Sequence, residues 1–320
     1  LSVAGGEPAP FGEIAGEPDA LTILNRAFTG APLTVRVAAG AVIAQPVVIV
    51  HWLDADGVAV FPRTLVQVAE GAEVTVVEVV ASGDVASLAV PVTELDIADA
   101  GHLRYLNLQT LGPRAWQIGL QASRVGRDAT LASASIAFGG DYARVRTDST
   151  LSGQGGSSRL LAVYFGEGDQ TLDFRTLQAH AAPKTFSDLL FKGAVAGSAH
   201  SVYSGLIRVR KGAAGTNAFQ TNRNLVLGAG AHADSVPNLE IEENDVHCSH
   251  ASAVGPIDDE QRFYLESRGV PPEVADRLIV LGFLDDALCQ APVPALLPWL
   301  RASFAAKLDH AELGQRQEAG

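Results

Sequence analysis

The chain contains no methionine and only two cysteines, Cys248 and Cys289. Two cysteines cannot build the disulfide framework of a small secreted domain, and no apolar run follows a basic segment near the N-terminus as a signal peptide requires. We therefore expect a protein of the reducing cytoplasm. Because the sequence starts at Leu1 and has no methionine, we also expect its beginning to be trimmed.

Basic residues are scarce as well. Lysine and arginine number 23 against 36 aspartates and glutamates, which gives a formal net charge of −13. Such a surface does not attract nucleic acid or an anionic membrane, because both need basic side chains to replace counterions. The segment 238–320 holds 15 of the acidic and 6 of the basic residues. This acidic segment either faces a basic partner or is simply solvated.

Long apolar runs and nucleotide-binding motifs are also missing. The most apolar early run, 37–50, is interrupted by glycine, glutamine and proline, and it is shorter than the roughly 20 residues of a membrane span. The chain has neither a phosphate-binding P-loop nor a Gly-x-Ser-x-Gly elbow. The run 228–233 matches the glycine pattern of a dinucleotide-binding motif, but a β-like segment with Pro237 follows it where that motif needs a helix. We therefore reject it as a dinucleotide site. We expect a soluble protein that does not span a membrane or bind nucleotides.

What the chain does contain is a globular composition, with 47% hydrophobic and 18% charged residues and 32 glycines in 320 residues. From Leu33 onward, short runs of valine, isoleucine, threonine and leucine alternate with glycine turns. Four of these turns, at Gly40, Gly71, Gly101 and Gly126, are separated by 31, 30 and 25 residues. A repeat of this length is typical of solenoids and bladed folds.

No helical pattern of ten or more residues lies between these strands, which excludes βαβ folds and leaves a β-helix, a sandwich or a propeller. A series of amide side chains favours the β-helix, because amides can stack into ladders between successive coils. The series is Asn217, Gln220, Asn222 and Asn224. We predict a mainly β protein with a parallel β-helix core over 31–254, preceded by an irregular lead-in segment at 1–30.

From 255 to 320 the pattern becomes that of helices, and we expect a C-terminal α-helical domain there. Asp258 followed by Gln261 predicts an N-cap, and Gly269 ends this first helix. A second helix starts near Pro272 and is apolar nearly all round, so that one side needs cover other than solvent. The third helix presents an apolar stripe of Leu297, Leu300, Phe304 and Leu308.

The densest group of side chains able to bind a soft metal lies in 238–250. In an extended strand, Cys248 and His250 point to one face while His247 and Ser249 point to the other. A thiolate and an imidazole on one face form a partial metal site, which needs ligands from elsewhere because a closed tetrahedral site has four. The same pattern also fits a buried structural cysteine beside a hydrogen-bonded histidine. The residues alone leave both interpretations open.

Around this cluster the sequence follows a specific series of motifs. These are Leu239-Glu240-Ile241, Asp245-Val246-His247-Cys248-Ser249-His250-Ala251, Val254-Gly255, Ile257-Asp258, Phe263-Tyr264-Leu265 and Ser267-Arg268-Gly269-Val270. With them the chain resembles the SufB/SufD family of iron-sulfur cluster assembly proteins. The runs 205–207 and 221–228 also resemble the last coils of that family, so the resemblance covers about 205–285. Within the family, the Cys-Ser-His order at 248–250 is most similar to SufD.

The resemblance implies a right-handed parallel β-helix core that pairs with a SufB-like paralogue, and C-terminal helices that dock a SufC-like ATPase. It implies that His250, together with Cys248, lies at the interface and helps a cysteine of the SufB partner hold a transient iron-sulfur cluster. Imidazole and thiolate both suit iron. The chain would be a non-catalytic scaffold without a cofactor of its own. Members of the family usually have an N-terminal helical segment as well, and 1–30 is too short to supply one.

Two other functions fit a β-helix. One is a carbohydrate-active enzyme of the polysaccharide lyase or esterase type, with a carboxylate-lined groove. Aromatic residues, which present platforms to sugars, make up only 6% of the chain and argue against it. The other is a structural module that self-associates, and a homodimer of the isolated chain is a further expectation where the paralogue is missing.

Overall fold

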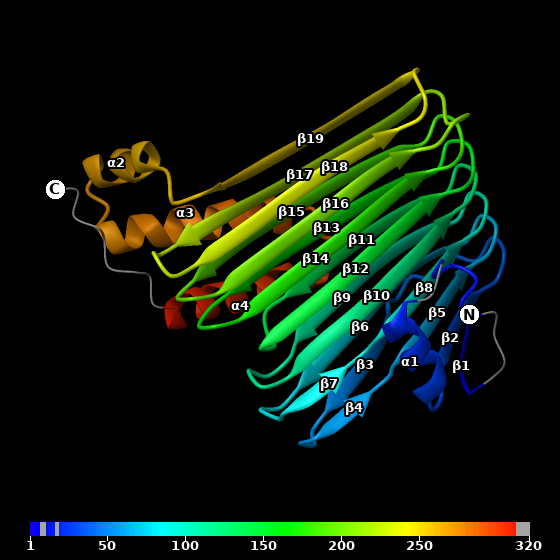
Figure 1. Ribbon diagram of the computed structural model, residues 1–320, viewed down its shortest axis with the longest axis horizontal. Coiled ribbons are helices and arrows are strands. Elements are labelled where there is room, and N and C mark those ends of the chain that lie inside the picture. The colour runs from blue at the N-terminus through cyan, green and yellow to red at the C-terminus, as the bar shows by residue number, and fades with distance from the viewer. Residues whose placement is uncertain (7–10, 17–18, 312–320) are drawn as a thin grey trace.

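The structure is a computed structural model and describes residues 1–6, 11–16 and 19–311. Within them the strands form two facing sheets wound as a β-helix, with the C-terminal helices beside one of the sheets (Figure 1). Sheet A has eleven strands: β1 Ser2–Gly5, β2 Leu33–Val37, β4 Val58–Val60, β5 Arg63–Val68, β7 Ser87–Ala89, β8 Val92–Ile97, β10 Trp116–Val125, β12 Tyr142–Leu151, β14 Thr171–His180, β16 His200–Val209 and β18 His232–Ile241.

Sheet B has eight strands in the described part of the chain: β3 Val47–Leu53, β6 Glu73–Ser82, β9 His102–Thr110, β11 Thr130–Ala137, β13 Ser157–Gly166, β15 Phe186–Ala196, β17 Thr216–Leu227 and β19 Val246–Gly255. From β8 onward the chain alternates between the sheets, and each strand pairs in parallel with the strand one coil earlier. The prediction of a mainly β protein with a parallel β-helix core is confirmed.

The turns between coils explain two of the repeated glycines. Gly71 has a φ of +63°, a left-handed conformation that side chains with a Cβ rarely adopt. Gly126 has no such φ, but an added Cβ would come within 2.9 Å of the Ala98 backbone carbon in the preceding coil. The repeat therefore reflects both turn geometry and the close stacking of successive turns.

The interior between the sheets is filled by alternate side chains of each strand. Tyr105, Tyr164 and Tyr203 are among its largest fully buried members. Ile207 and Val209 of β16 point inward and are completely buried, while Arg208 between them points outward and pairs with Glu240 at 2.9 Å. This alternation is the one that the sequence predicts for a half-buried strand.

The amide side chains of β17 do not form the ladder between coils that the sequence analysis expects. Asn224 instead donates to Asn222 Oδ1 along the same strand at 2.9 Å, and Tyr164 of β13 donates to Asn224 Oδ1 at 2.6 Å. Tyr164, Gly193 and Asn224 are aligned on three successive coils. The tyrosine ring lies across Gly193, where an added Cβ would come within 1.9 Å of it. Asn222, Asn224 and Tyr164 thus hydrogen-bond with one another inside the core.

The segment 1–30 is more regular than expected. It contains β1, which pairs antiparallel with β2, and helix α1 at Ala20–Phe28, whose N-cap Asp19 accepts hydrogen bonds from two backbone N–H groups. Asn25 fixes the helix to the β-helix, because its Nδ2 donates to the carbonyl groups of Pro62 and Val90. The prediction of an irregular segment is therefore wrong for these residues. Residues 7–10, 17–18 and 312–320 lie outside the described part.

The C-terminal region folds as helices at the predicted places: α2 Asp259–Ser267, α3 Pro272–Leu288, the short 3-10 helix η1 Pro294–Leu296 and α4 Leu297–His310. Asp258 caps α2 by accepting from the backbone N–H groups of Glu260 and Gln261. Gly269 follows α2 with a φ of +85°. In the described residues, no helix is long and apolar enough to cross a membrane.

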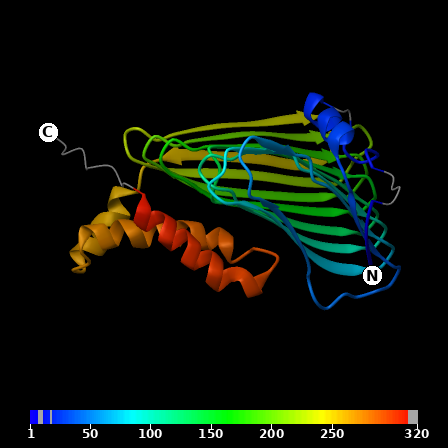
Figure 2. The same ribbon diagram turned by 90° about the horizontal axis from the view of Figure 1, so that it is seen from below.

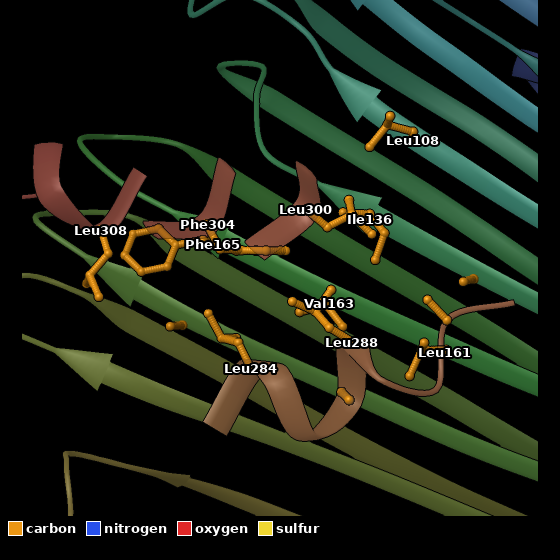
Figure 3. Close-up of a cluster of buried hydrophobic side chains, with 14 of the residues drawn as sticks. Leu108, Ile136, Leu161, Val163, Phe165, Leu284, Leu288, Leu300, Phe304 and Leu308 are labelled. Atoms are coloured by element: carbon orange, nitrogen blue, oxygen red, sulfur yellow. The ribbon is translucent and has the colours of Figure 1, made fainter. Parts of the chain in front are cut away.

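Helices α3 and α4 lie against the outer face of sheet B, on the side away from sheet A (Figure 2). Leu284 and Leu288 of α3 and Phe304 of α4 are buried in one cluster with outward side chains of β13, among them Val163 and Phe165 (Figure 3). The apolar surplus that sequence analysis finds on the second helix is therefore covered largely by the sheet itself. Leu278 remains 49% exposed.

One buried group makes stability depend on pH. His180 lies inside the β-helix, with Nδ1 2.8 Å from Thr185 Oγ1 and Nε2 2.9 Å from Ser187 Oγ. Burial lowers the pKa of His180 from 6.5 to about 4. Below pH 6.5 the His180 imidazole of the unfolded chain binds a proton, whereas that of the folded chain stays neutral down to about pH 4. The free energy of unfolding should therefore fall between pH 6.5 and 4 and level off below pH 4.

Urea denaturation at pH 7 and pH 5 measures this effect. The His180 contribution should lower the free energy of unfolding by about 2 kcal/mol at pH 5 relative to pH 7. His180→Asn should lose that share of the pH dependence, whereas His102→Ala, which removes an exposed imidazole, should keep it. An unchanged pH dependence in His180→Asn would contradict the assignment.

Candidate functional site

The β-helix ends in an open coil. This terminal coil, residues 232–255, consists of β18, β19 and their connection (Figure 1). β18 pairs only with β16, and β19 only with β17, so that within the described residues each strand has one edge without a strand partner. Such an edge presents free N–H and C=O groups and is a template for a further strand. Both sheets are therefore open at the same end.

The inward side chains of this coil are also uncovered. Leu239 and Ile241 of β18 continue the inward column of Ile207 and Val209, yet they are 36% and 43% exposed, whereas Ile207 and Val209 are fully buried. Val254 of β19 is 44% exposed. The last layer of the apolar core thus faces outward along the solenoid axis. Apolar surface of this kind marks a contact site.

Cys248 lies on the inward face of β19, in register with Ala218 of β17. Its side chain packs against a small cluster that includes Ile207 and Val209. Burial raises the pKa of the Cys248 thiol, and a backbone hydrogen bond from Ala218 only partly opposes this. The group is therefore largely protonated at neutral pH, and a metal must displace that proton before the sulfur can bind it.

His250 lies on the same inward face, two residues further along β19, and it is exposed. It is in register with Gln220 of β17, whose buried carboxamide makes no hydrogen bond among the described residues. His247 points to the opposite face. The strand thus brings Cys248 and His250 to one side, where both reach the open end.

These two residues supply an incomplete ligand set. A soft thiolate and an imidazole suit iron, but two ligands do not close a site. A metal held here needs further ligands from a molecule that covers the terminal coil.

A second surface lies on the C-terminal helices. A groove of about 520 Å³ runs between α3 and α4. We call it the α3–α4 groove, and it is lined by Leu278, Leu281, Leu284, Leu288, Ala302 and Phe304 with Asp285 and Arg301 at its rim. Asp285 pairs with Arg301 at 2.6 Å. The groove is apolar with a polar rim, which is the usual composition of a protein contact surface.

Comparison with known proteins decides the family. The family model of the "SUF system FeS cluster assembly, SufBD core domain" matches residues 51–283. The chain belongs to the SufB/SufD family. SufD of Escherichia coli is 34% identical over 222 residues, which cover 69% of this chain and 52% of that protein. SufD of Bacillus subtilis is 30% identical over 277 residues, or 85% of this chain and 63% of that protein.

An iron-sulfur cluster assembly SufBD family protein of Mycobacterium tuberculosis is 39% identical over 227 residues, which cover 68% of this chain and 57% of that protein. The likeness to SufD that the Cys-Ser-His order indicates is confirmed. The chain spans about half to two thirds of the length of these SufB/SufD relatives. Membership in this family does not favour the alternative of a carbohydrate-active β-helix enzyme.

The structure also brings together a group that sequence analysis missed. His200 of β16 and His232 and Asp234 of β18 place their ligand atoms within 4.8 Å of one another on the outer face of sheet A. In this SufB/SufD chain the two histidines are in register, 32 residues apart, which is close to the glycine repeat. That spacing is the one sequence signal that points to the group.

Proposed function

We propose that this chain is a non-catalytic scaffold subunit in iron-sulfur cluster assembly. It pairs with a SufB-like paralogue at the terminal coil, docks a SufC-like ATPase on its C-terminal helices and helps to hold a cluster during its assembly. The observation that carries the proposal is the open terminal coil, which combines two free strand edges, an uncovered apolar layer and two iron-compatible side chains.

A paralogue with the same fold suits the terminal coil better than an unrelated protein does. Its own terminal strands can pair with β18 and β19 and continue both sheets at once. Its inward side chains would then cover Leu239, Ile241 and Val254, which are exposed in this chain. A second copy of the chain meets the same requirements, and we propose a homodimer where the paralogue is missing.

The cluster site in this proposal is shared between the two subunits. His250 provides an exposed imidazole, and Cys248 lies two residues away with its thiol at the edge of the apolar core. A cysteine of the partner supplies the further thiolate. Because this chain contributes few ligands and its Cys248 is protonated at neutral pH, the cluster is held loosely enough to leave.

The energy for assembly comes from the ATPase partner in this proposal. The sequence has no phosphate-binding P-loop of its own. The α3–α4 groove offers apolar contacts, and the acidic excess of 238–320 steers a basic partner surface toward it. Cys248 and Cys289 are both free thiols. We propose the cytoplasm as the compartment, because it keeps thiols reduced.

Replacement of His250 tests this function. His250→Ala should leave the fold intact, because an exposed side chain that makes no hydrogen bond to the described residues contributes little to stability. Cluster formation by the chain reconstituted with SufB-like and SufC-like partners should fall at least about tenfold, because a ligand to iron is lost. Circular dichroism and the visible absorption of the cluster measure the two effects.

His247→Ala is the matched control, since it removes an exposed imidazole from the opposite face of the same strand. It should assemble the cluster at the rate of the unaltered chain. If His250→Ala does so too, with unchanged stability, His250 has no part in cluster assembly.

A further inference from the structure

Two imidazoles and one carboxylate converge on the outer face of sheet A. His200 Nε2 lies 2.8 Å from Asp234 Oδ2, and His232 Nε2 lies 3.1 Å from Asp234 Oδ1. The fold fixes this arrangement in two ways. In-register pairing of β16 and β18 sets the two histidines side by side, and the two-residue period of a strand puts Asp234 on the same face as His232.

This group differs from the other carboxylates on the outer face. Those typically pair with arginine, as Asp96 does with Arg124 and Asp173 with Arg175. In the part of the chain that the structure describes, the ion pairs of Asp234 are formed with the two imidazoles alone. A guanidinium cannot bind a metal ion, whereas an imidazole can. At this position the outer face of sheet A therefore has three side chains that can bind a metal ion, where elsewhere it has an aspartate–arginine pair.

The geometry suits a metal ion. Ligand atoms at about 2.0–2.2 Å from one metal ion lie roughly 3–3.6 Å from one another, and one ligand atom from each of these three residues lies within 4.8 Å of the others. The side chains of His200, His232 and Asp234 are 36%, 67% and 49% exposed, so an ion can reach them and water can fill the remaining positions. Hydrogen bonding by His200, with that of His232, lowers the pKa of Asp234, and the carboxylate is ionised at neutral pH.

We propose that His200, His232 and Asp234 form a binding site for a divalent first-row transition-metal ion, separate from the Cys248 and His250 pair. Two imidazoles and one carboxylate on one side of an ion are a ligand set used for Zn²⁺ and for non-haem Fe²⁺. The remaining coordination positions of the ion are open to water. To bind a metal through Nε2, each neutral imidazole carries its single proton on Nδ1, so that the Nε2 lone pair turned toward Asp234 is free for the ion.

Titration with Co²⁺ tests the site, because bound Co²⁺ absorbs in the visible range. The chain carries Cys248→Ser and His250→Ala, which remove the candidate cluster ligands, and it is first stripped with a chelator. It should bind about one Co²⁺ per chain, and Zn²⁺ should displace this ion.

In the same background, His232→Ala and Asp234→Asn should each weaken Co²⁺ binding by more than about 100-fold, since each removes a direct ligand. His102→Ala is the control, because His102 is exposed and opens strand β9 as His200 and His232 open theirs. Thermal unfolding without metal should be alike in all variants, and metal should raise the melting temperature of the parent and control only.

Two results would overturn the site. One is a stripped parent chain that binds no Co²⁺ or Zn²⁺ at submillimolar concentrations. The other is binding that persists unchanged in His232→Ala. Either result leaves the scaffold function intact, because that function depends on the open edges and inward side chains of the terminal coil and is tested through His250.

Discussion

A chain with lysine at both Leu239 and Val254 should no longer bind a SufB-like paralogue. Both side chains face the open end of the solenoid and are 36% and 44% exposed, so that the isolated chain keeps the new ammonium groups in water. When a partner stacks on the terminal coil, both charges become buried without a counterion. An unpaired buried charge costs several kcal/mol, and the affinity should fall by more than about 100-fold.

Val236→Lys is the matched control for this experiment. Val236 belongs to the same strand as Leu239 and is 53% exposed, but it points to the outer face, where a lysine stays solvated after pairing. Size-exclusion chromatography and calorimetry with the paralogue give the affinities, and circular dichroism gives the stability. Full affinity in the double lysine chain would show that the partner binds elsewhere. The same variant should also abolish the homodimer.

Aspartate at both Leu278 and Ala302 should abolish binding of a SufC-like ATPase. The two positions lie on opposite walls of the α3–α4 groove, and both are exposed. Stability should change by less than about 0.5 kcal/mol, because neither side chain is part of the buried cluster beneath the helices. The loss of affinity should exceed about 30-fold, since two carboxylates must lose their water in an apolar contact.

Val274→Asp is the control on the same helix, because Val274 is 39% exposed and lies outside the groove. Pull-down and calorimetry with the ATPase separate the two variants. Point substitutions are preferable to deletion of the helices, which would uncover Val163 and Phe165 on sheet B and favour aggregation. An ATPase that still binds the groove variant would place the dock elsewhere.

The sequence predicts the main architecture because its signals are local. Glycine turns at a coil-length repeat indicate a solenoid, and the N-cap at Asp258 with Gly269 after the helix defines α2. The alternation around Cys248 and His250 correctly predicts that both lie on one face of a strand. Each of these features depends on residues close together in the chain.

Contacts between side chains on different coils cannot be predicted from the sequence, because they depend on the register between coils. The approach of His200 to His232 follows from pairing across 32 residues, which no local pattern reveals. The same holds for Asn224, whose partner Tyr164 lies two coils away. Helix α1 was missed for another reason. Its nine residues are too few to show a clear period, and contacts of Asn25 with the β-helix stabilise it.

The alignment of Tyr164, Gly193 and Asn224 changes how the middle of the solenoid comes apart. Repeats that touch only their neighbours can fray one at a time. Here Tyr164 of β13 reaches across β15 and donates a hydrogen bond to Asn224 of β17. Loss of β17 therefore also leaves the buried Tyr164 hydroxyl, two coils further inside, without this partner. A slip of β15 by two residues would put Phe191 or Val195 where only Gly193 fits under the ring. The three coils therefore share one register and should open as a single cooperative unit.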